Sequence, residues 1–131
     1  MTESKGGGLE RLEKARIIVD AALDKKAEDL VALDVREIVS FADTFVIASG
    51  SSDRHVRSIV EGIEEALRLR GEKPIGIEGM EEARWVLIDA DDAIVHVFLR
   101  DVRQHYDLER LWSDAPKLTF VGLPEAKGAT R

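Results

Sequence analysis

A short, wholly apolar run that passes directly into a turn and an amphipathic helix constrains the fold of this chain most strongly. Residues 45–48 read Phe-Val-Ile-Ala between polar neighbours, which is typical of a β-strand covered on both faces. Gly50, Ser51 and Ser52 then supply a turn and a helix N-cap. Asp53 adds a carboxylate in the first helical turn, where backbone N–H groups lack partners. The segment therefore predicts a buried strand joined to a helix by a structural turn.

Hydrophobic spacing predicts the other elements of a single α/β domain. A first amphipathic helix runs from Leu9 to about Lys26, and a second carries its apolar stripe over residues 56–67. Gly71 ends that second helix as a C-cap. The order predicts a mixed five-stranded sheet flanked by helices, with a right-handed crossover between residues 45 and 77. The remaining strands are expected at 30–35, 74–78, 85–89 and 93–99, the last two as a hairpin, and a third helix at about 102–112.

The two ends of the chain differ in character from its middle. Residues 1–8 are polar and include three consecutive glycines, so we expect a disordered N-terminus. Residues 116–131 contain prolines and glycines with little periodicity, which favours a flexible C-terminal tail. The folded domain is therefore expected to span residues 9–115.

Length and composition limit the classes of function. The 131 residues include no cysteine and no apolar stretch of membrane-spanning length, so we expect one soluble domain without disulfides or zinc thiolates. The formal net charge of −7 repels phosphate backbones and favours a basic protein partner over nucleic acid. Glu3, Glu10 and Glu13 near the N-terminus are unlike an acid-poor organellar transit peptide. We therefore expect a bacterial cytoplasmic protein.

Residues 78–92 carry the clearest binding signal. This segment has six acidic side chains and a single basic one, Arg84, and Trp85 lies among them. If Trp85 heads a strand, its indole can lie at the rim of the sheet among acids, as expected of a hot spot for a basic partner. A second interpretation places Trp85 in the core and treats the acids as a solvated loop. The residues alone leave both interpretations open.

Two blocks of residues, which together cover most of positions 30–115, carry a family pattern. The first block is Asp34, Phe41, Ala42, Asp43, Phe45, Gly50, Ser52, Arg54, Val56 and Ile59. The second is Pro74, Glu78, Gly79, Trp85, Asp89, Val95, His96, Val97, Phe98, Arg103, Tyr106, Leu108, Glu109, Leu111, Trp112, Asp114 and Ala115. In both blocks the chain resembles the ribosomal silencing factor family, the bacterial and organellar relatives of the plant protein Iojap. One departure lies in the hairpin turn, where Asp91 and Asp92 stand in place of a glycine followed by an acid.

The resemblance implies a ribosome-binding protein rather than an enzyme, without cofactor or metal. It implies docking on the fourteenth protein of the large ribosomal subunit, a basic protein at the surface where the small subunit joins. Joining is then blocked sterically and translation is repressed. Matched by position, Glu78, Gly79 and Trp85 would form the docking face, with Met80 and Asp89 as further candidates. A homodimer that uses the same face is an alternative arrangement.

The sheet expected from the resemblance is also similar to the nucleotidyltransferase core, which gives an enzymatic alternative. Such enzymes hold a triphosphate with a Gly-Ser pair at a helix start and two metal ions with an Asp-x-Asp on a following strand. Gly50 and Ser51 match the first feature. Asp89 and Asp91 have the second spacing, but they lie two strands later, at a hairpin with no basic clamp nearby. The helix-cap interpretation of the turn is therefore preferred.

The three histidines are interpreted as structural or surface groups. His96 alternates with Ile94 and Phe98 on one strand face, so we expect a packed histidine whose ring nitrogens are hydrogen-bonded. His55 lies in the first turn of a helix among Arg54 and Arg57, and His105 lies beside Tyr106 in the last helix, so neither is taken as a metal ligand.

Overall fold

The helices and strands follow one another in the predicted order throughout the part of the chain that the structure describes. The computed structural model describes residues 10–106 and 115–118. The third helix begins two residues before its predicted start, and its predicted continuation beyond residue 106 lies outside the described residues. The elements are α1 (Arg11–Asp24), β1 (Glu28–Asp34), β2 (Thr44–Gly50), α2 (Asp53–Leu69), β3 (Gly76–Glu78), β4 (Trp85–Ala90), β5 (Ala93–Leu99) and α3 (Arg100–Tyr106).

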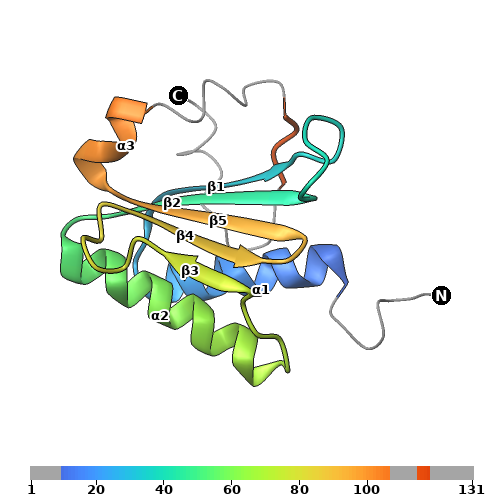
Figure 1. Ribbon diagram of the computed structural model, residues 1–131, viewed down its shortest axis with the longest axis horizontal. Helices are drawn as coiled ribbons and strands as arrows, with labels where there is room; N and C mark the ends of the chain where they lie inside the picture. Colours follow the sequence, from blue (N-terminus) through green and yellow to red (C-terminus); the bar gives the residue numbers. More distant parts are fainter. Residues whose placement is uncertain (1–9, 107–114, 119–131) are drawn as a thin grey trace.

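The strands form one mixed sheet in the order β1-β2-β5-β4-β3 (Figure 1). Strands β2 and β5 pair in parallel, and the other neighbours pair antiparallel. Because β5 and β2 run the same way and two antiparallel steps separate β5 from β3, β3 also runs parallel to β2. Helix α2 therefore makes a crossover from the middle of the sheet to its edge. The mixed, five-stranded α/β fold predicted from the sequence is confirmed.

One face of the sheet is covered by α1 and α2, which lie together below it in Figure 1. The stripe predicted on α2 is buried here, and full burial of each of its aliphatic side chains contributes about 1.5–3 kcal/mol. Gly50 lies where β2 meets this helix, and a Cβ there would come within 2.9 Å of Val56. A glycine is therefore needed for this close packing. The fully buried residues of the α2 stripe are Val56, Ile59, Val60, Ile63 and Leu67.

The predicted end of α2 is confirmed as a glycine cap. Gly71 has a φ of 80°, and its N–H donates to the carbonyl of Arg68 at 3.0 Å. The N–H of Glu72 donates to the carbonyl of Leu67 at 2.9 Å. These two bonds satisfy carbonyls that the end of a helix would otherwise leave open.

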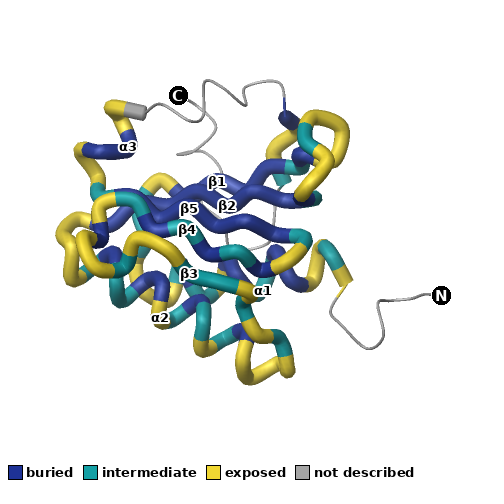
Figure 2. Tube along the Cα trace, in the orientation of Figure 1, coloured by how far each residue is buried: buried dark blue, intermediate teal, exposed yellow. Residues whose placement is uncertain are grey.

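The opposite face of the sheet carries a second apolar cluster, which includes Phe45, Ile47 and Phe98. Val102 of α3 and Ala115 pack against it, so this face is covered by shorter segments than the helical face. Every residue of β2 is buried, which confirms the predicted strand with both faces covered (Figure 2). The alternation in β4 places Trp85, Leu87 and Asp89 on this second face, where each is only partly buried.

The segment 115–118 lies along the free side of β1. The N–H of Asp34 donates to the carbonyl of Pro116, and the N–H of Leu118 donates to the carbonyl of Ala32, both at 2.8 Å. Leu33 and Lys117 form the β-bridge between them. The first residues of the predicted tail are therefore paired with the sheet. The rest of that tail, 119–131, and the predicted disordered start, 1–8, lie outside the described residues.

The predicted hairpin between β4 and β5 is present, with Ala90 paired to Ala93. Asp91 in its turn has a φ of 75°, in the left-handed region that glycine adopts most easily. The carboxylate of Asp89 accepts a hydrogen bond from the N–H of Asp91 at 3.1 Å. This bond supports the aspartate at a position where the family pattern has a glycine.

A buried lysine ties α1 to the hairpin. Lys14 is 4% exposed, and its Nζ donates to the carbonyl of Ala90 at 2.9 Å. The same ammonium lies 3.0 Å from Asp92 and 3.2 Å from Glu72. Burial alone would lower the pKa of Lys14, but the two carboxylates outweigh it and raise that pKa above its usual value.

Within residues 10–106 and 115–118, no helix is long and apolar enough to cross a lipid bilayer.

Candidate functional site

A tight loop, residues 79–84, joins β3 to β4 and carries two exposed acids, Glu81 and Glu82. Gly79 has a φ of 93°, and a Cβ at this position would collide with the carbonyl oxygen of Trp85. Ala83 closes the loop by donating its N–H to the carbonyl of Gly79 at 2.9 Å, with a φ of 54°. Two residues of left-handed backbone therefore define the loop, and the position of Gly79 excludes any side chain.

Arg57 of α2 holds the same loop from the helical side. Its Nε donates to the carbonyl of Met80 at 3.0 Å, and its Nη2 donates to the carbonyl of Glu81 at 2.6 Å. Its Nη1 lies 3.3 Å from the carboxylate of Asp53, one turn earlier on the helix. The sequence does not reveal this role, because the carbonyls belong to residues more than 20 positions away.

Trp85 begins β4 directly after the loop, and its indole lies on the second face of the sheet. The ring stacks on Phe98, with centroids 5.0 Å apart and an interplanar angle of 28°. The indole Nε1–H donates to Nδ1 of His96 at 3.1 Å. The sequence leaves open whether Trp85 lies at the rim of the sheet or in the core. In the structure it is partly buried, which is intermediate between the two.

His96 is a packed histidine, as predicted, and one of its nitrogens is bonded. It is 7% exposed, and burial lowers its pKa from 6.5 to about 4, so the ring is neutral near pH 7. Because the indole N–H can only donate, Nδ1 is the acceptor and the ring proton lies on Nε2. Within the described residues Nε2 is buried without a hydrogen-bond partner. The prediction is therefore confirmed for Nδ1 and wrong for Nε2.

The structure brings together only some of the residues predicted for docking. Glu78 is exposed at the end of β3, Gly79 follows it, and the backbone of Trp85 packs directly against that glycine. Asp89 shares the sheet face of Trp85 but lies at the other end of β4, about 13 Å along the strand. Met80 is partly buried and packs against the core on the helical side. Glu78, Gly79 and Trp85 form the compact part of the predicted set.

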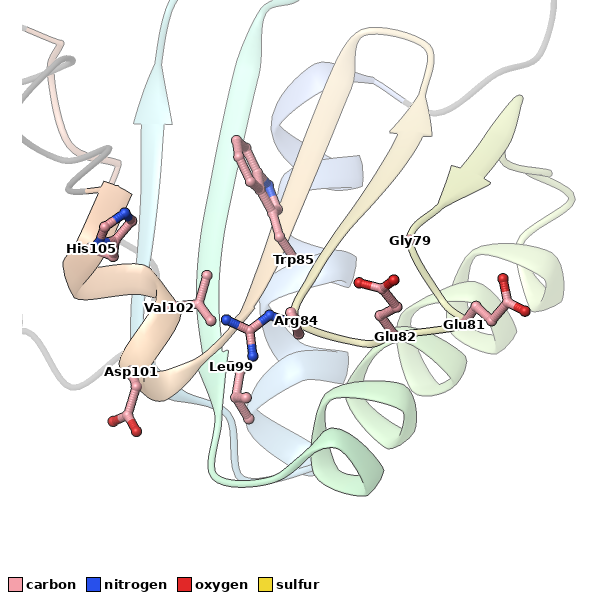
Figure 3. A pocket seen from close by; sticks show the side chains of 9 residues that line it. All are labelled: Gly79, Glu81, Glu82, Arg84, Trp85, Leu99, Asp101, Val102 and His105. Atoms are coloured by element: carbon pink, nitrogen blue, oxygen red, sulfur yellow. The ribbon is translucent and has the colours of Figure 1, made fainter.

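A hollow of about 810 Å³ opens beside Trp85, between the loop and α3 (Figure 3). Helix α3 begins directly after β5 and is anchored through Arg103, whose Nη1 donates to Oγ of Ser49 at 2.8 Å. The sequence interpretation missed the part of this hollow that α3 supplies, because it assigned no binding role to that helix. The lining residues are Gly79, Glu81, Glu82, Arg84, Trp85, Leu99, Asp101, Val102 and His105.

The Gly-Ser turn before α2 is capped by its own side chains, as predicted. Oγ of Ser52 accepts from the N–H of His55 at 3.1 Å, and Asp53 accepts from the N–H of Arg54 at 2.8 Å. The N–H of Ser51 donates to Nδ1 of His55 at 2.9 Å. These donors, which a triphosphate would need, are therefore engaged, and the Asp53 carboxylate adds repulsion toward phosphate.

His55 and the paired aspartates are structural groups. Nε2 of His55 donates to the carbonyl of Lys25 at 2.8 Å and so ties the start of α2 to the end of α1. Asp89 caps the hairpin turn, and Asp92 pairs with Lys14. Among residues 10–106 and 115–118, no three histidine, aspartate or glutamate side chains are grouped as a metal would require.

Comparison with known proteins identifies the family of this chain. The family model "Ribosomal silencing factor during starvation" matches residues 9–131. The ribosomal silencing factor of Bacillus subtilis is 46% identical over 101 residues, covering 77% of this chain and 86% of that protein. The crystal structure of protein CV0518 from Chromobacterium violaceum superposes with a TM-score of 0.79 at 34% identity, covering 92% of this chain and 98% of that one. More distantly, mouse "Mitochondrial assembly of ribosomal large subunit protein 1" is 29% identical over 100 residues, 74% of this chain and 44% of that protein. The chain belongs to the ribosomal silencing factor family.

Proposed function

We propose that this protein binds the large ribosomal subunit and prevents the small subunit from joining, which represses translation. Membership of the silencing factor family supports an action on the ribosome. The name of the mouse relative, which refers to the large ribosomal subunit, supports the choice of subunit. The partner within that subunit is taken from the family resemblance as its fourteenth protein, a basic protein.

The observation that carries the proposal is the partly exposed Trp85 beside an acidic loop. We call the surface formed by Glu78, Gly79, Glu81, Glu82 and Trp85 the docking face. All three glutamates are exposed, and the indole beside them offers apolar area. An aromatic anchor surrounded by one sign of charge suits a partner of the opposite charge, because the charges steer the encounter and the ring supplies contact area.

The proposed mechanism is occupancy, without chemical turnover. A folded domain bound where the subunits meet excludes the small subunit by its volume. Inhibition should therefore saturate near one copy per large subunit, and joined ribosomes should scarcely be split. A homodimer through the docking face would compete with ribosome binding, which the sedimentation of the free protein over a concentration series would reveal.

The direct test is co-sedimentation of the protein with purified large and small subunits. Trp85→Ala should weaken binding to the large subunit by about 2 kcal/mol or more, about 30-fold in Kd, as for a hot-spot aromatic. Phe41→Ala is the matched control, because Phe41 is a 65% exposed aromatic on the loop between β1 and β2. Circular dichroism must show both variants folded. Equal binding by the two variants would remove Trp85 from the docking face.

Light scattering during subunit mixing tests the mechanism. Inhibition of joining should rise in proportion to occupancy of the large subunit. Strong inhibition at amounts far below one copy per subunit would contradict simple blocking and favour an enzyme. Incubation with labelled nucleoside triphosphates and magnesium addresses that enzymatic alternative, and a labelled product lost in Ser51→Ala would establish it.

A further inference from the structure

We propose that His96 is the positioning residue of the docking face, and that it makes Trp85 an apolar and π contact rather than a hydrogen-bond donor. This inference rests on the proposed function and specifies the chemistry of the same surface. Its consequence is that the partner places an alkyl or cationic side chain, such as lysine or arginine, against the exposed part of the indole.

The first step is the use of the indole N–H. Tryptophan has one polar hydrogen, on Nε1, and no acceptor. In this protein Nε1 donates to Nδ1 of His96 at 3.1 Å, across the β4–β5 pair. A partner that bonded to this N–H would have to break the internal bond and leave Nδ1 of the buried His96 unpaired. Leaving a buried acceptor without a partner is unfavourable, so the existing bond should persist in the complex.

The second step is the rigidity of His96. Its ring meets Phe45 edge-on, with centroids 5.3 Å apart, and lies nearly parallel to Phe98, with an interplanar angle of 13°. Phe98 also stacks on the indole of Trp85. The imidazole ring is thus fixed by two aromatic neighbours. It therefore cannot move with the indole of Trp85 if that side chain changes rotamer. Trp85 is therefore already held by its hydrogen bond to His96 and its stack on Phe98 before any partner arrives, which lowers the entropic cost of ordering it on binding.

The third step is the chemistry left for the partner. An indole whose donor is engaged still offers apolar area and a π-face, which attracts cations. Glu81 and Glu82 line the same hollow as Trp85, and Glu78 is exposed at the end of β3. These three carboxylates outnumber Arg84, the one basic residue of the loop, and can neutralise such a cation. A lysine or arginine side chain suits both features, since its stem contacts the ring and its charge meets the carboxylates.

Binding of two tryptophan variants to the large subunit separates these roles. Trp85→Phe keeps a ring but loses the N–H and with it the bond to His96, so its affinity should fall only about fivefold, as in His96→Phe, whereas Trp85→Ala should lose about 30-fold. If Trp85→Phe loses as much as Trp85→Ala, the indole N–H reaches the partner and the proposal is overturned.

Two histidine variants test positioning. His96→Phe fills the space without an acceptor, and His96→Gln offers a side-chain oxygen to the indole N–H. We expect His96→Phe to weaken large-subunit binding about fivefold, and His96→Gln to restore it to within about twofold of wild type. A purely packing role would predict the reverse order, because phenylalanine suits the aromatic surroundings better than glutamine.

The indole N–H resonance of the free protein gives an independent readout. Its NMR signal, assigned with Trp85→Phe, should exchange slowly with solvent in wild type and His96→Gln, and quickly in His96→Phe. The indole of Trp112 provides an internal reference. Equal exchange in all three proteins would refute positioning by His96. If wild type fails to bind large subunits, the proposed function is wrong, while this measurement still decides whether His96 holds the indole.

Discussion

Acidification should destabilise this protein through one buried side chain, His96. Burial lowers the pKa of this histidine from 6.5 to about 4. In the unfolded chain the imidazole takes up a proton as the pH falls below about 6.5, whereas in the folded protein it stays neutral until about pH 4. The unfolded state binds more protons between these values. The contribution of His96 to the free energy of unfolding is therefore most favourable above pH 6.5, falls as the pH drops toward 4, and levels off below.

The size of this loss follows from the gap between the two pKa values. It corresponds to about 3 kcal/mol at pH 4, of which about 2 kcal/mol is already lost at pH 5. Asp34 acts in a separate window, because its hydrogen bond with Arg36 lowers its pKa from 3.8 to about 2. Any stability from Asp34 is present above pH 3.8 and is lost as the pH falls toward 2. Measurements between pH 8 and 5 therefore separate His96 from this carboxylate.

Urea unfolding at about pH 7.5 and pH 5 measures the effect directly. The free energy of unfolding of wild type should fall by about 2 kcal/mol between the two pH values. That of His96→Phe should fall much less, because the variant lacks the imidazole that takes up a proton in the unfolded state. Phe41→Ala is the matched control, since it changes an exposed side chain that binds no proton and should keep the wild-type change with pH. If wild type and His96→Phe show the same change with pH, the assignment of the buried neutral histidine is wrong.

Two further predictions concern the supports of the fold and of the docking face. Gly79→Ala should lower the free energy of unfolding by about 2 kcal/mol or more, because its Cβ collides with the Trp85 carbonyl, and chemical denaturation will measure the loss. The same change at Gly76, where a Cβ meets nothing within 4 Å, should be nearly neutral. Lys14→Met should cost about 3 kcal/mol in thermal unfolding by removing the ammonium that pairs with the partly buried carboxylates of Asp92 and Glu72, and adding Asp92→Asn should recover part of it. A double variant no more stable than Lys14→Met would contradict that pairing.

The elements that the sequence predicts well depend on local patterns. The apolar run at 45–48 and the stripe on α2 are contained within one element each, so spacing alone identifies them. The pairing of Leu33 with Lys117 joins residues far apart in the chain, and no local pattern encodes it. The prolines and glycines of residues 116–131 are the local signal there, and they predict a flexible tail. The start of that tail nevertheless lies along β1.

The docking face shows the same division between local and long-range information. Glu78, Gly79 and Trp85 come from the family resemblance, and periodicity alone does not single them out. The contact of Trp85 with His96 could have been anticipated, because a two-residue hairpin turn after Ala90 fixes the β4–β5 register. That register places Trp85 opposite Phe98 and diagonal to His96, which lies two residue pairs further along the ladder. The hydrogen bonds from Arg57 to the loop carbonyls cannot be predicted from the sequence in this way, because they depend on where α2 packs.

These supports bear on the proposed mechanism, in which a small surface acts by occupancy without turnover. The loop is fixed by the left-handed backbone of Gly79 and Ala83 and by the hydrogen bonds from Arg57 of α2. The indole of Trp85, which follows the loop, is fixed by its hydrogen bond to His96. Each constraint removes freedom from the free protein, so little conformational entropy remains to be lost when the docking face meets its partner. A protein that blocks at about one copy per subunit has no turnover to amplify a weak contact. Its effect depends on residence time, which a preorganised aromatic anchor lengthens because it slows dissociation.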